Sequence, residues 1–570
     1  MHTLRRAGRF HVERTAGAPG RTVPAVTATH EVTNQVPPLA GYDPVAGDAA
    51  LAEACVRHAG EATLASLADL GRLAGSEQAR EWGRLADENR PVLRTHDRYG
   101  HRVDEVEFHP AWHELVRTAF AHGLAGAPWA AAEAGDRHAH VRRAVGYLAW
   151  TQVEAGHGCP VTMTYAAVPA LRAAPGLAAR YGPGLTGTGY APGLTDPAAK
   201  PGLVAGMGMT EKQGGSDVRS NTTRAVPAGD GTYALTGHKW FTSAPMSDLF
   251  LVLAQLPEGP SCFLMPRVLP DGTRNVFRLQ RLKDKLGDRA NASSEVEFDG
   301  TTAWPVGEPG RGVPTIIEMV AATRLDCVVG SAATVRAALT QALHHARHRR
   351  AFGARLADQP LMQNVLADLA VESEAATALA IRLAAAVDAG ETAFLRLAGA
   401  AAKFLVCKRA PTAVAEALEV LGGNGYVEES GLPRLYRQAP LNSIWEGSGN
   451  VIALDVLRAL GRSSESLAAV TAEIDLARGA DARLDAAAKR LAAELGDPEA
   501  LPLRARRVAG LLALCLQGSL LVRSAPPEVA DAFCATRLDG DWGTVLGTLP
   551  AGSAAARIVD RAVVREEPRS

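Results

Sequence analysis

The chain has 570 residues, enough for three or four domains with a large combined core. Its 60 basic and 61 acidic residues give a formal net charge of -1, which excludes the general basic excess of a protein built to bind nucleic acid or acidic membranes. Its seven cysteines are far apart and form no CxxC pair, so we expect reduced core thiols and no metal site. Since no apolar run approaches the roughly 18 residues of a membrane span, we expect a cytoplasmic protein.

Composition and periodicity divide the chain into five segments. Arginines among glycine, proline and threonine open the chain, so residues 1–40 are expected to be disordered. Residues 41–200 carry Ala, Leu, Glu and Arg at helical spacing and predict an N-terminal helical domain. Residues 201–306 hold short aromatic and β-branched segments between turn residues, which predicts a central β domain of meander or barrel type. Helical periodicity returns in 307–462, a predicted bundle, and continues in a C-terminal helical domain, 463–570.

The stretch 206–223, GMGMTEKQGGSDVRSNTT, packs glycines, hydroxyls and a carboxylate into one turn before the strand-like segments. Glycine lets backbone N–H groups approach a ligand without a Cβ in the way. The hydroxyls of Thr210 and Ser216 are donors suited to a flavin edge or a pyrophosphate. These residues favour a cofactor-binding loop.

Met-Thr-Glu followed by Gly-Ser-Asp in this loop resembles the flavin loop of the acyl-CoA dehydrogenase family. The fuller string TEKQGGSDVRSNTTR resembles the AidB-like alkylation-response branch of that family. Four other strings resemble the same branch: CPVTMTYAA, RLKDKLGDRANASSEVEF, EVLGGNGY and SIWEGSGN. The resemblance covers about residues 40–460 and implies a mainly α fold with a central β domain. That fold has a helical domain, a β-barrel and a four-helix bundle, here with an extra C-terminal helical domain. The resemblance also implies a homotetramer with one FAD per chain.

The resemblance further implies which residues contact FAD. In HKWFTSAP, Trp240 would lie against the flavin ring and Thr242 would hydrogen-bond flavin N5, whereas a tryptophan packed in the core is the alternative. In HHARHRRAFG, Arg349 would pair with the flavin pyrophosphate, often of a neighbouring subunit, with a metal site or a DNA-facing strip as alternatives. The full expected set is Met207, Met209, Thr210, Gly214, Gly215, Ser216, Trp240, Phe241, Thr242, Arg349, Phe352, Gly422, Gly423, Trp445, Ser448 and Asn450.

The string IWEGSGN carries the candidate catalytic group. Glu446 beside Trp445 in a glycine-rich turn favours desolvation, which raises a carboxyl pKa from about 4.3 towards the range of a general base. The resemblance implies that Glu446 removes the α-proton of an acyl thioester while flavin N5 takes the β-hydride. A solvated glutamate at a helix start is the alternative. Some relatives place the base at the position of Thr323, which cannot serve, so Glu446 is the matching candidate and Arg324 a structural or charge-setting neighbour.

Two functions remain open from the sequence. One is FAD-dependent α,β-dehydrogenation of an acyl-CoA thioester. The other is a DNA-associated protection or repair role in the alkylation response, in which the flavoprotein inactivates alkylating agents with little dehydrogenase turnover. Residues 461–570 contain 14 basic and 15 acidic residues, so we expect at most weak binding of duplex DNA through a local patch of Arg504, Arg506 and Arg507.

Overall fold

Short helices and one β-hairpin make up the N-terminal domain. The computed structural model describes residues 29–497 and 499–564, and residues from 36 onwards form one compact unit. Of the segment expected to be disordered, residues 1–28 lie outside the described residues, whereas Leu39 is buried. The helices are α1 (Ala49–Ala59), α2 (Glu61–Ser66), α3 (Ala68–Ala74), α4 (Glu77–Glu88), α5 (Pro110–Ala121), α6 (Ala127–Glu133), α7 (Ala139–Thr151), α8 (Gly158–Leu171) and α9 (Pro175–Leu185).

The hairpin lies inside residues 41–200, which the sequence predicts to form an N-terminal helical domain. Strands β1 (Val92–His96) and β2 (Arg102–Glu107) pair antiparallel and lie beside strand β8 (Arg278–Leu282) of the central domain. Asp97 closes the turn because its carboxylate accepts hydrogen bonds from the backbone N–H groups of Tyr99 and His101. The helical expectation is therefore wrong for these residues, since local turn chemistry outweighs the composition of the surrounding segment.

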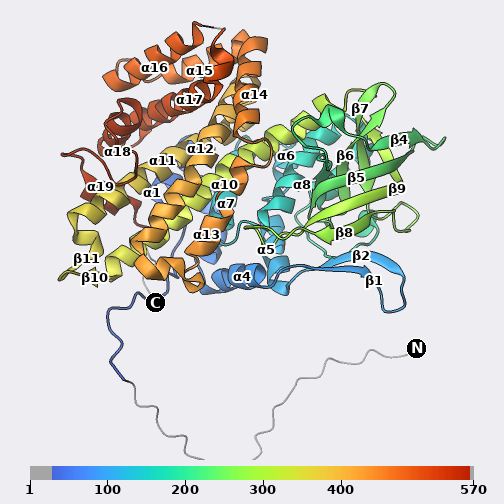
Figure 1. Ribbon diagram of the computed structural model, residues 1–570, viewed down its shortest axis with the longest axis horizontal. Helices are drawn as coiled ribbons and strands as arrows, with labels where there is room; N and C mark the ends of the chain where they lie inside the picture. Colours follow the sequence, from blue (N-terminus) through green and yellow to red (C-terminus); the bar gives the residue numbers. More distant parts are fainter. Residues whose placement is uncertain (1–28, 498, 565–570) are drawn as a thin grey trace, which may run out of the picture. The chain divides into compact units, whose positions relative to one another are not determined.

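The central domain is a closed β-barrel, which confirms the barrel alternative (Figure 1). The ring runs β6, β4, β5, β9, β7 and back to β6; β3 adds parallel to β6 and β8 adds to β9. Phe250, Phe263 and Phe298 fill its interior. The strands are β3 (Ala205–Gly208), β4 (Arg224–Pro227), β5 (Tyr233–Ser243), β6 (Leu249–Leu256), β7 (Gly259–Pro266), β8 (Arg278–Leu282) and β9 (Ser293–Val306).

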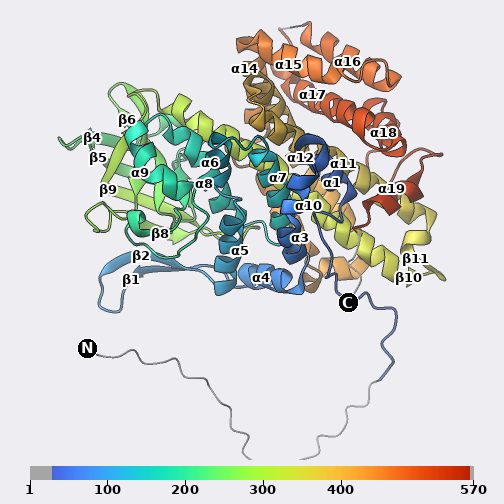
Figure 2. The same cartoon turned by 180° about the vertical axis from the view of Figure 1, so that it is seen from behind.

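Three long helices form the bundle, and α10 runs from the barrel across its whole length (Figures 1 and 2). Alanine is frequent on the buried faces of these helices, so their backbones pack closely. Gly312 starts α10 directly against β7, where a Cβ would lie 2.4 Å from the carbonyl carbon of Ser261. The elements are α10 (Gly312–His348), β10 (Arg350–Ala351), β11 (Ala354–Arg355), α11 (Pro360–Asp388), α12 (Thr392–Val420), α13 (Leu432–Gln438) and α14 (Gly449–Arg462).

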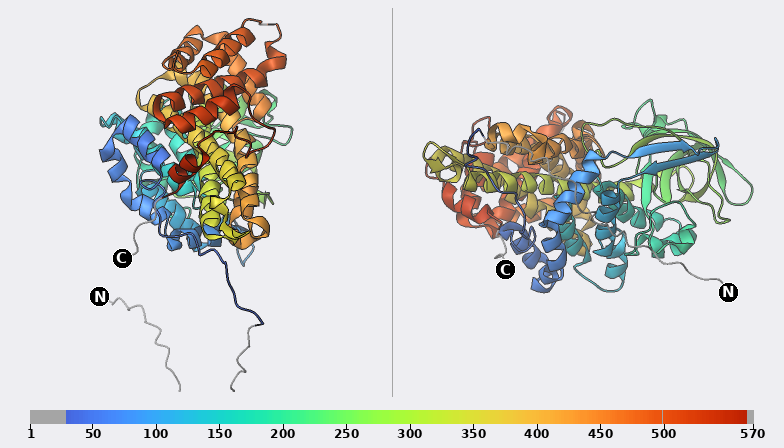
Figure 3. Two further views of the ribbon diagram at one scale, coloured as in Figure 1. Left: turned by 90° about the vertical axis from the view of Figure 1, so that its left-hand side faces the viewer. Right: turned by 90° about the horizontal axis from the view of Figure 1, so that it is seen from below.

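The C-terminal helices pack on α11, α12 and α14 of the bundle (Figure 3). Buried ion pairs join the two layers, because Arg537 meets Asp368 and Glu372 of α11. Within the bundle, Arg409 of α12 also pairs with Glu372. The helices are α15 (Ser464–Asp475), α16 (Ala482–Leu495), α17 (Leu501–Ser524), α18 (Pro527–Phe533) and α19 (Ala555–Ala562).

Helix α17 qualifies as a membrane span by length and composition, the one such helix among the described residues. The expectation that no segment approaches this length of apolar chain is therefore wrong. In the structure 67% of its most apolar window is buried, and Val508, Leu512 and Leu516 lie in the core. Its apolar character is accounted for by packing against the bundle.

Candidate functional site

The turn that carries Glu446 lies between the short 3-10 helix η6 (Leu441–Ser443) and α14. Glu446 and Gly447 both have positive φ angles, 57° and 109°, so the chain reverses sharply at this point. Lys403, buried in α12, holds the turn: its Nζ donates to the carbonyl oxygens of Trp445 at 2.8 Å and Gly447 at 2.7 Å. A lysine inside an apolar, alanine-rich helix needs such partners, so the position of Lys403 in the sequence is itself a signal for a polar contact, although it does not identify the partner.

The Glu446 carboxylate faces α10. The hydroxyl of Thr323 donates to Glu446 Oε2 at 2.7 Å, so the two alternative base positions of the family meet here. Arg324 Nε donates to the backbone carbonyl of Glu446 at 3.1 Å and its Nη1 to Asp455 at 2.7 Å, which makes Arg324 the structural neighbour that the sequence predicts. Burial raises the pKa of Glu446 above its ordinary value, and the Thr323 hydrogen bond offsets part of that rise.

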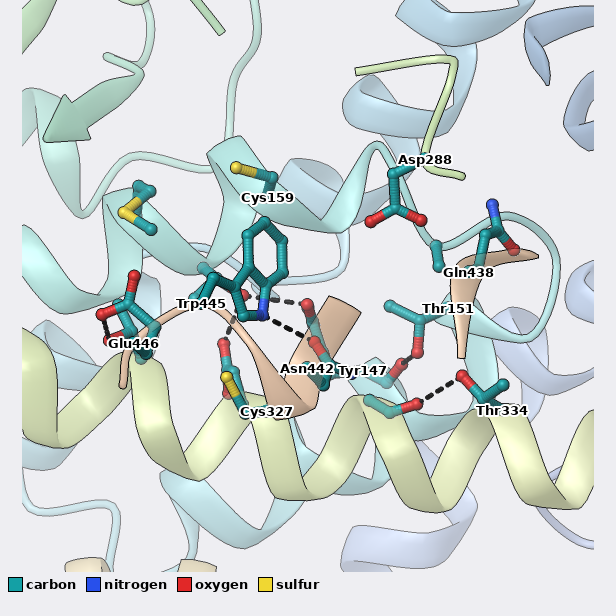
Figure 4. A pocket seen from close by; sticks show the side chains of 16 residues that line it. Tyr147, Thr151, Cys159, Asp288, Cys327, Thr334, Gln438, Asn442, Trp445 and Glu446 are labelled. Atoms are coloured by element: carbon teal, nitrogen blue, oxygen red, sulfur yellow. Dashed lines mark hydrogen bonds between the residues drawn. The ribbon is translucent and has the colours of Figure 1, made fainter. Parts of the chain in front are cut away.

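A narrow cavity begins at Glu446 and follows α10 into the molecule (Figure 4). Glu446 lies at one end, the Trp445 indole lies across the middle, and Asp288 and Gln438 lie at the other end. The remaining lining residues come from α7, the α7–α8 connection, α8, α10 and η6: Tyr147, Thr151, Ala155, Cys159, Thr162, Met163, Thr323, Asp326, Cys327, Gly330, Thr334 and Asn442. Glu446 therefore faces a narrow internal space that extends beside α10.

The predicted cofactor loop lies against β5. The backbone N–H of Trp240 donates to the backbone carbonyl of Thr210 at 2.8 Å, which brings the loop and the Trp-x-Thr strand together. Gly215 is required by packing, since a Cβ there would lie 2.5 Å from Thr210 Oγ1. Glu211 anchors the loop to β5 through a fully buried ion pair between its carboxylate and Lys239 Nζ, 2.7 Å apart. Glu211 is thus committed to holding the loop and is not available to a ligand.

Two observations indicate that this surface fits a flavin. Thr242 Oγ1 is buried without a hydrogen-bond partner among the described residues, as expected of a hydroxyl reserved for a cofactor. Met207, Met209 and Trp445 pack on one apolar cluster, which joins the loop to the Glu446 turn. Trp240 is half-buried, with Lys283 Nζ 3.2 Å from its ring centroid, and Phe241 beside it is half exposed.

The other expected flavin contacts lie elsewhere in the chain. Arg349 follows α10, and Phe352 in the next turn has a positive φ of 51° and is fully exposed. This end of α10, with β10 and β11, lies at the opposite end of the molecule from the barrel (Figures 1 and 2). Gly422 and Gly423 begin the 3-10 helix η4 (Gly422–Tyr426) and are exposed. One chain alone therefore does not bring all the expected contacts together.

The C-terminal arginines have other roles than an open basic patch. Arg504 Nη1 and Arg507 Nε both bind Glu494, at 2.7 and 2.6 Å, and Arg504 Nη2 lies 3.3 Å from Asp497, so two carboxylates compensate the charge of these two arginines. Arg506 Nη1 donates to Asn450 Oδ1 at 2.9 Å, at the start of α14. Two groups that the sequence assigns to different ligands, DNA and flavin, are thus in contact. Only the fold could show this, because the two residues lie far apart in the sequence.

The described residues contain no cluster of three or more His, Cys, Asp or Glu side chains that could hold a metal ion. His344 and His348, the pair with metal-like spacing, lie with their ring centroids 4.4 Å apart and their planes tilted by 46°. All seven cysteines are buried and unpaired, which confirms the expectation of core thiols.

Comparison with known proteins identifies the family. Residues 34–192 match the AidB N-terminal domain of adaptive response proteins, 206–301 the acyl-CoA dehydrogenase middle domain, and 310–461 its C-terminal domain. AidB of Escherichia coli strain K12 is 45% identical over 524 residues, which are 91% of this chain and 96% of that protein. The chain belongs to the acyl-CoA dehydrogenase family. Its resemblance to the AidB-like branch is thereby confirmed.

Other acyl-CoA dehydrogenases agree. Acyl-CoA dehydrogenase family member 11 of Caenorhabditis elegans is 33% identical over 396 residues, 66% of this chain and 63% of that protein. The crystal structure of Caenorhabditis elegans ACDH-11 in complex with C11-CoA has a TM-score of 0.82 at 27% identity, over 91% of this chain and 95% of that chain. Butyryl-CoA dehydrogenase of Megasphaera elsdenii shares the fold, with a TM-score of 0.53 over 68% of this chain and 99% of that chain. The chain is thus an oxidoreductase by family, with the predicted fold.

Proposed function

We propose that this protein is an FAD-dependent dehydrogenase that introduces a double bond between the α- and β-carbons of an acyl-CoA thioester, with Glu446 as the base. The observation that carries the proposal is the Glu446 carboxylate, which is desolvated, hydrogen-bonded to Thr323 and placed at one end of an internal cavity. A relative of similar structure was crystallised with C11-CoA, which supports a thioester as the substrate class.

FAD would be held by the loop at 206–216 and by β5. The Thr242 hydroxyl, which has no hydrogen-bond partner among the described residues, would contact the flavin. Gly215 packs so closely against the Thr210 side chain that the loop has no room for a Cβ at this position. When bound, FAD supplies the acceptor for the hydride that leaves the β-carbon.

The side chains of the protein have separate tasks in the reaction. Glu446 takes the proton from the α-carbon, which leaves its bonding electrons to form the new double bond as the β-hydride departs. The Thr323 hydroxyl fixes the orientation of Glu446 Oε2, and the Lys403 ammonium holds the two backbone carbonyls that flank it. Glu446 can act only when ionised, so the rate of proton removal is expected to rise with pH through its raised pKa.

A second copy of the chain would complete the cofactor site. Within the described chain Arg349 and Phe352 lie at the far end of the molecule from the barrel (Figure 1). A fully exposed phenylalanine and the nearby Leu361, 85% exposed, are typical of a surface that another subunit covers. We propose a homotetramer in which this end of one chain reaches the FAD held by the barrel of another.

The test is anaerobic titration of the FAD-loaded protein with acyl-CoA thioesters of graded length, followed by bleaching of the flavin absorbance. We expect bleaching by at least one thioester in the wild type, and none in Glu446→Gln at unchanged flavin content. A Glu446→Gln variant that bleaches as fast as the wild type would refute Glu446 as the base. A wild type that binds FAD but is bleached by no thioester would refute the dehydrogenase proposal.

Dehydrogenation is preferred to a DNA-associated role. Two of the three arginines expected to contact phosphates are already paired with Glu494, and the third contacts Asn450. Since each phosphate contact requires a cation that a carboxylate does not neutralise, this surface gives little support for DNA binding.

A further inference from the structure

The end of the cavity remote from Glu446 is polar, unlike a site for a plain hydrocarbon chain. Asp288 and Gln438 line this end, and the exposed fraction of each residue is only 4% (Figure 4). Thr151 and Thr334 lie on the same side of the cavity. The middle, around the Trp445 indole, is less polar and contains Cys159 and Cys327 (Figure 4). Asn442 also lies there, but its side-chain oxygen already accepts the indole N–H at 2.8 Å.

Both Asp288 and Gln438 retain a side-chain oxygen that has no hydrogen-bond partner among the described residues. These atoms are Asp288 Oδ1 and Gln438 Oε1. The amide nitrogen of Gln438 is already used, since it donates to Glu154 Oε1 at 3.1 Å. A buried acceptor left unpaired costs roughly 1 to 3 kcal/mol, so two at one end of a cavity indicate that a ligand or water satisfies them.

The backbone holds these two residues in place. Asp288 has a φ of 48°, a left-handed conformation that is unfavourable for a residue other than glycine. Gly287 before it packs against α13, where a Cβ would lie 2.4 Å from the carbonyl oxygen of Arg437. Lys285 Nζ fixes the loop by donating to the backbone carbonyl of Asp288 at 2.9 Å. The unpaired oxygens are therefore positioned by rigid neighbours.

The chemistry of this end favours a neutral hydrogen-bonding group. Gln438 Oε1 can only accept, so its partner must donate. Burial raises the pKa of Asp288 to about 7, so this carboxyl is protonated for part of the time at neutral pH and can then donate as well as accept. Among the neighbouring charges, the Lys285 ammonium lowers this pKa, whereas the Glu154 and Asp87 carboxylates raise it. One cation against two carboxylates does not favour an anionic group. A hydroxyl, which both donates and accepts, matches this pair.

We propose that the acyl thioester substrate carries a hydroxyl group at the end remote from the thioester, and that Asp288 and Gln438 receive this hydroxyl while Glu446 acts on the α-carbon. The inference rests on the proposed function for the position of the thioester. The distance from Glu446 to the Asp288 and Gln438 end of the cavity sets the length of acyl chain that fits. Thr323 beside Glu446 and Thr334 near the far end are eleven residues apart on α10, or about 16 Å along the helix axis.

The experiment measures binding separately from turnover. Isothermal titration of the FAD-loaded protein compares ω-hydroxyacyl-CoA with the matched alkyl acyl-CoA at each chain length, and flavin bleaching is recorded with the same pairs. At the length that fits the cavity, we expect the hydroxy compound to bind roughly tenfold more tightly, as for one well-made hydrogen bond to a buried acceptor. Gln438→Leu should reduce this ratio to near one.

Thr151→Val is the matched control. It removes a hydroxyl from the same end of the cavity, but one that already donates to the Tyr147 carbonyl at 2.7 Å, so the preference for the hydroxy compound should remain. Flavin content and gel filtration establish that each variant folds. The wild-type comparison needs no variant.

The outcomes separate this inference from the proposed function. If alkyl and hydroxy compounds bind equally at every length while flavin is bleached, the hydroxyl site is wrong and ordered water satisfies the two oxygens. If the hydroxy compounds bind preferentially but no thioester bleaches the flavin, the hydroxyl site holds and the dehydrogenase proposal fails. If no thioester binds, both are overturned.

Discussion

Replacing Lys403 with methionine tests how the turn keeps Glu446 in place. The substitution preserves the length of the side chain but removes the ammonium that donates to the Trp445 and Gly447 carbonyls. Each carbonyl left without a partner costs up to about 3 kcal/mol, but the turn is half-buried and water recovers part of this. We therefore expect the free energy of unfolding to fall by roughly 1 to 3 kcal/mol in a urea titration.

The same variant should change the pH dependence of flavin reduction. The charge of Lys403 lowers the pKa of Glu446 and so opposes the rise caused by burial. Without it the pKa of Glu446 rises further, and the ascending limb of the rate of flavin reduction should move to higher pH. Stopped-flow measurements across the pH range with one fixed thioester give this limb directly.

Lys408→Met is the control, because Lys408 lies on the same helix and its Nζ is 3.4 Å from Ser443 Oγ, with no contact to the turn carbonyls. The limb should stay in place in that variant. If the limb is also unmoved in Lys403→Met, Lys403 does not act on the base. An unfolding free energy that does not change would show that the turn is held by other contacts.

Three further outcomes are expected. Glu446→Gln should leave the fold at least as stable at neutral pH, as measured by thermal unfolding. A carboxyl whose pKa is raised by folding stabilises the folded state at pH values below its unfolded pKa of 4.5, and that stabilisation is lost as the pH rises through the folded pKa, so its removal costs nothing at neutral pH. Thr242→Val should leave thermal unfolding unchanged, because the hydroxyl has no partner among the described residues, but slow flavin reduction about two- to tenfold; an unaffected rate would remove Thr242 from the flavin site. Arg506→Ala should lower FAD retention on gel filtration through loss of the contact with Asn450, whereas Arg504→Ala should not, and the reverse order would contradict this assignment.

Local sequence patterns carried much of the fold and part of the site. The short β-branched segments indicated a meander or barrel, and the glycines and hydroxyls around Thr210 indicated a cofactor loop. The link between this loop and Trp240 came from the family resemblance, and in the structure a backbone hydrogen bond joins the two. The contact of Thr323 with Glu446 spans 123 residues and depends on how α10 packs against the turn. The hairpin at β1 and β2 was missed because its signal is short and lies in a helical context.

The cavity could not be predicted from sequence. Asp288 and Gln438 are 150 residues apart in the sequence, and both are polar residue types that sequence analysis assigns to the surface. Their burial follows from the approach of α13 to the loop at Gly287, which is a property of packing. The pKa of Asp288 depends on that burial, so neither its value nor its position in the cavity has a local sequence signal.

The ion pair between Arg537 and Asp368, beneath the C-terminal helices, makes two distant positions of the chain depend on each other. Asp368 lies on the bundle and Arg537 on the added domain, and both side chains are almost completely buried. A chain that lost the domain would expose the face of α11 and leave the carboxylate of Asp368 without its cation. We therefore expect the two residues to be inherited or lost as a pair across relatives. Since this face is already covered within one chain, the proposed homotetramer would have to form through other surfaces, such as the end of α10 that carries the exposed Phe352.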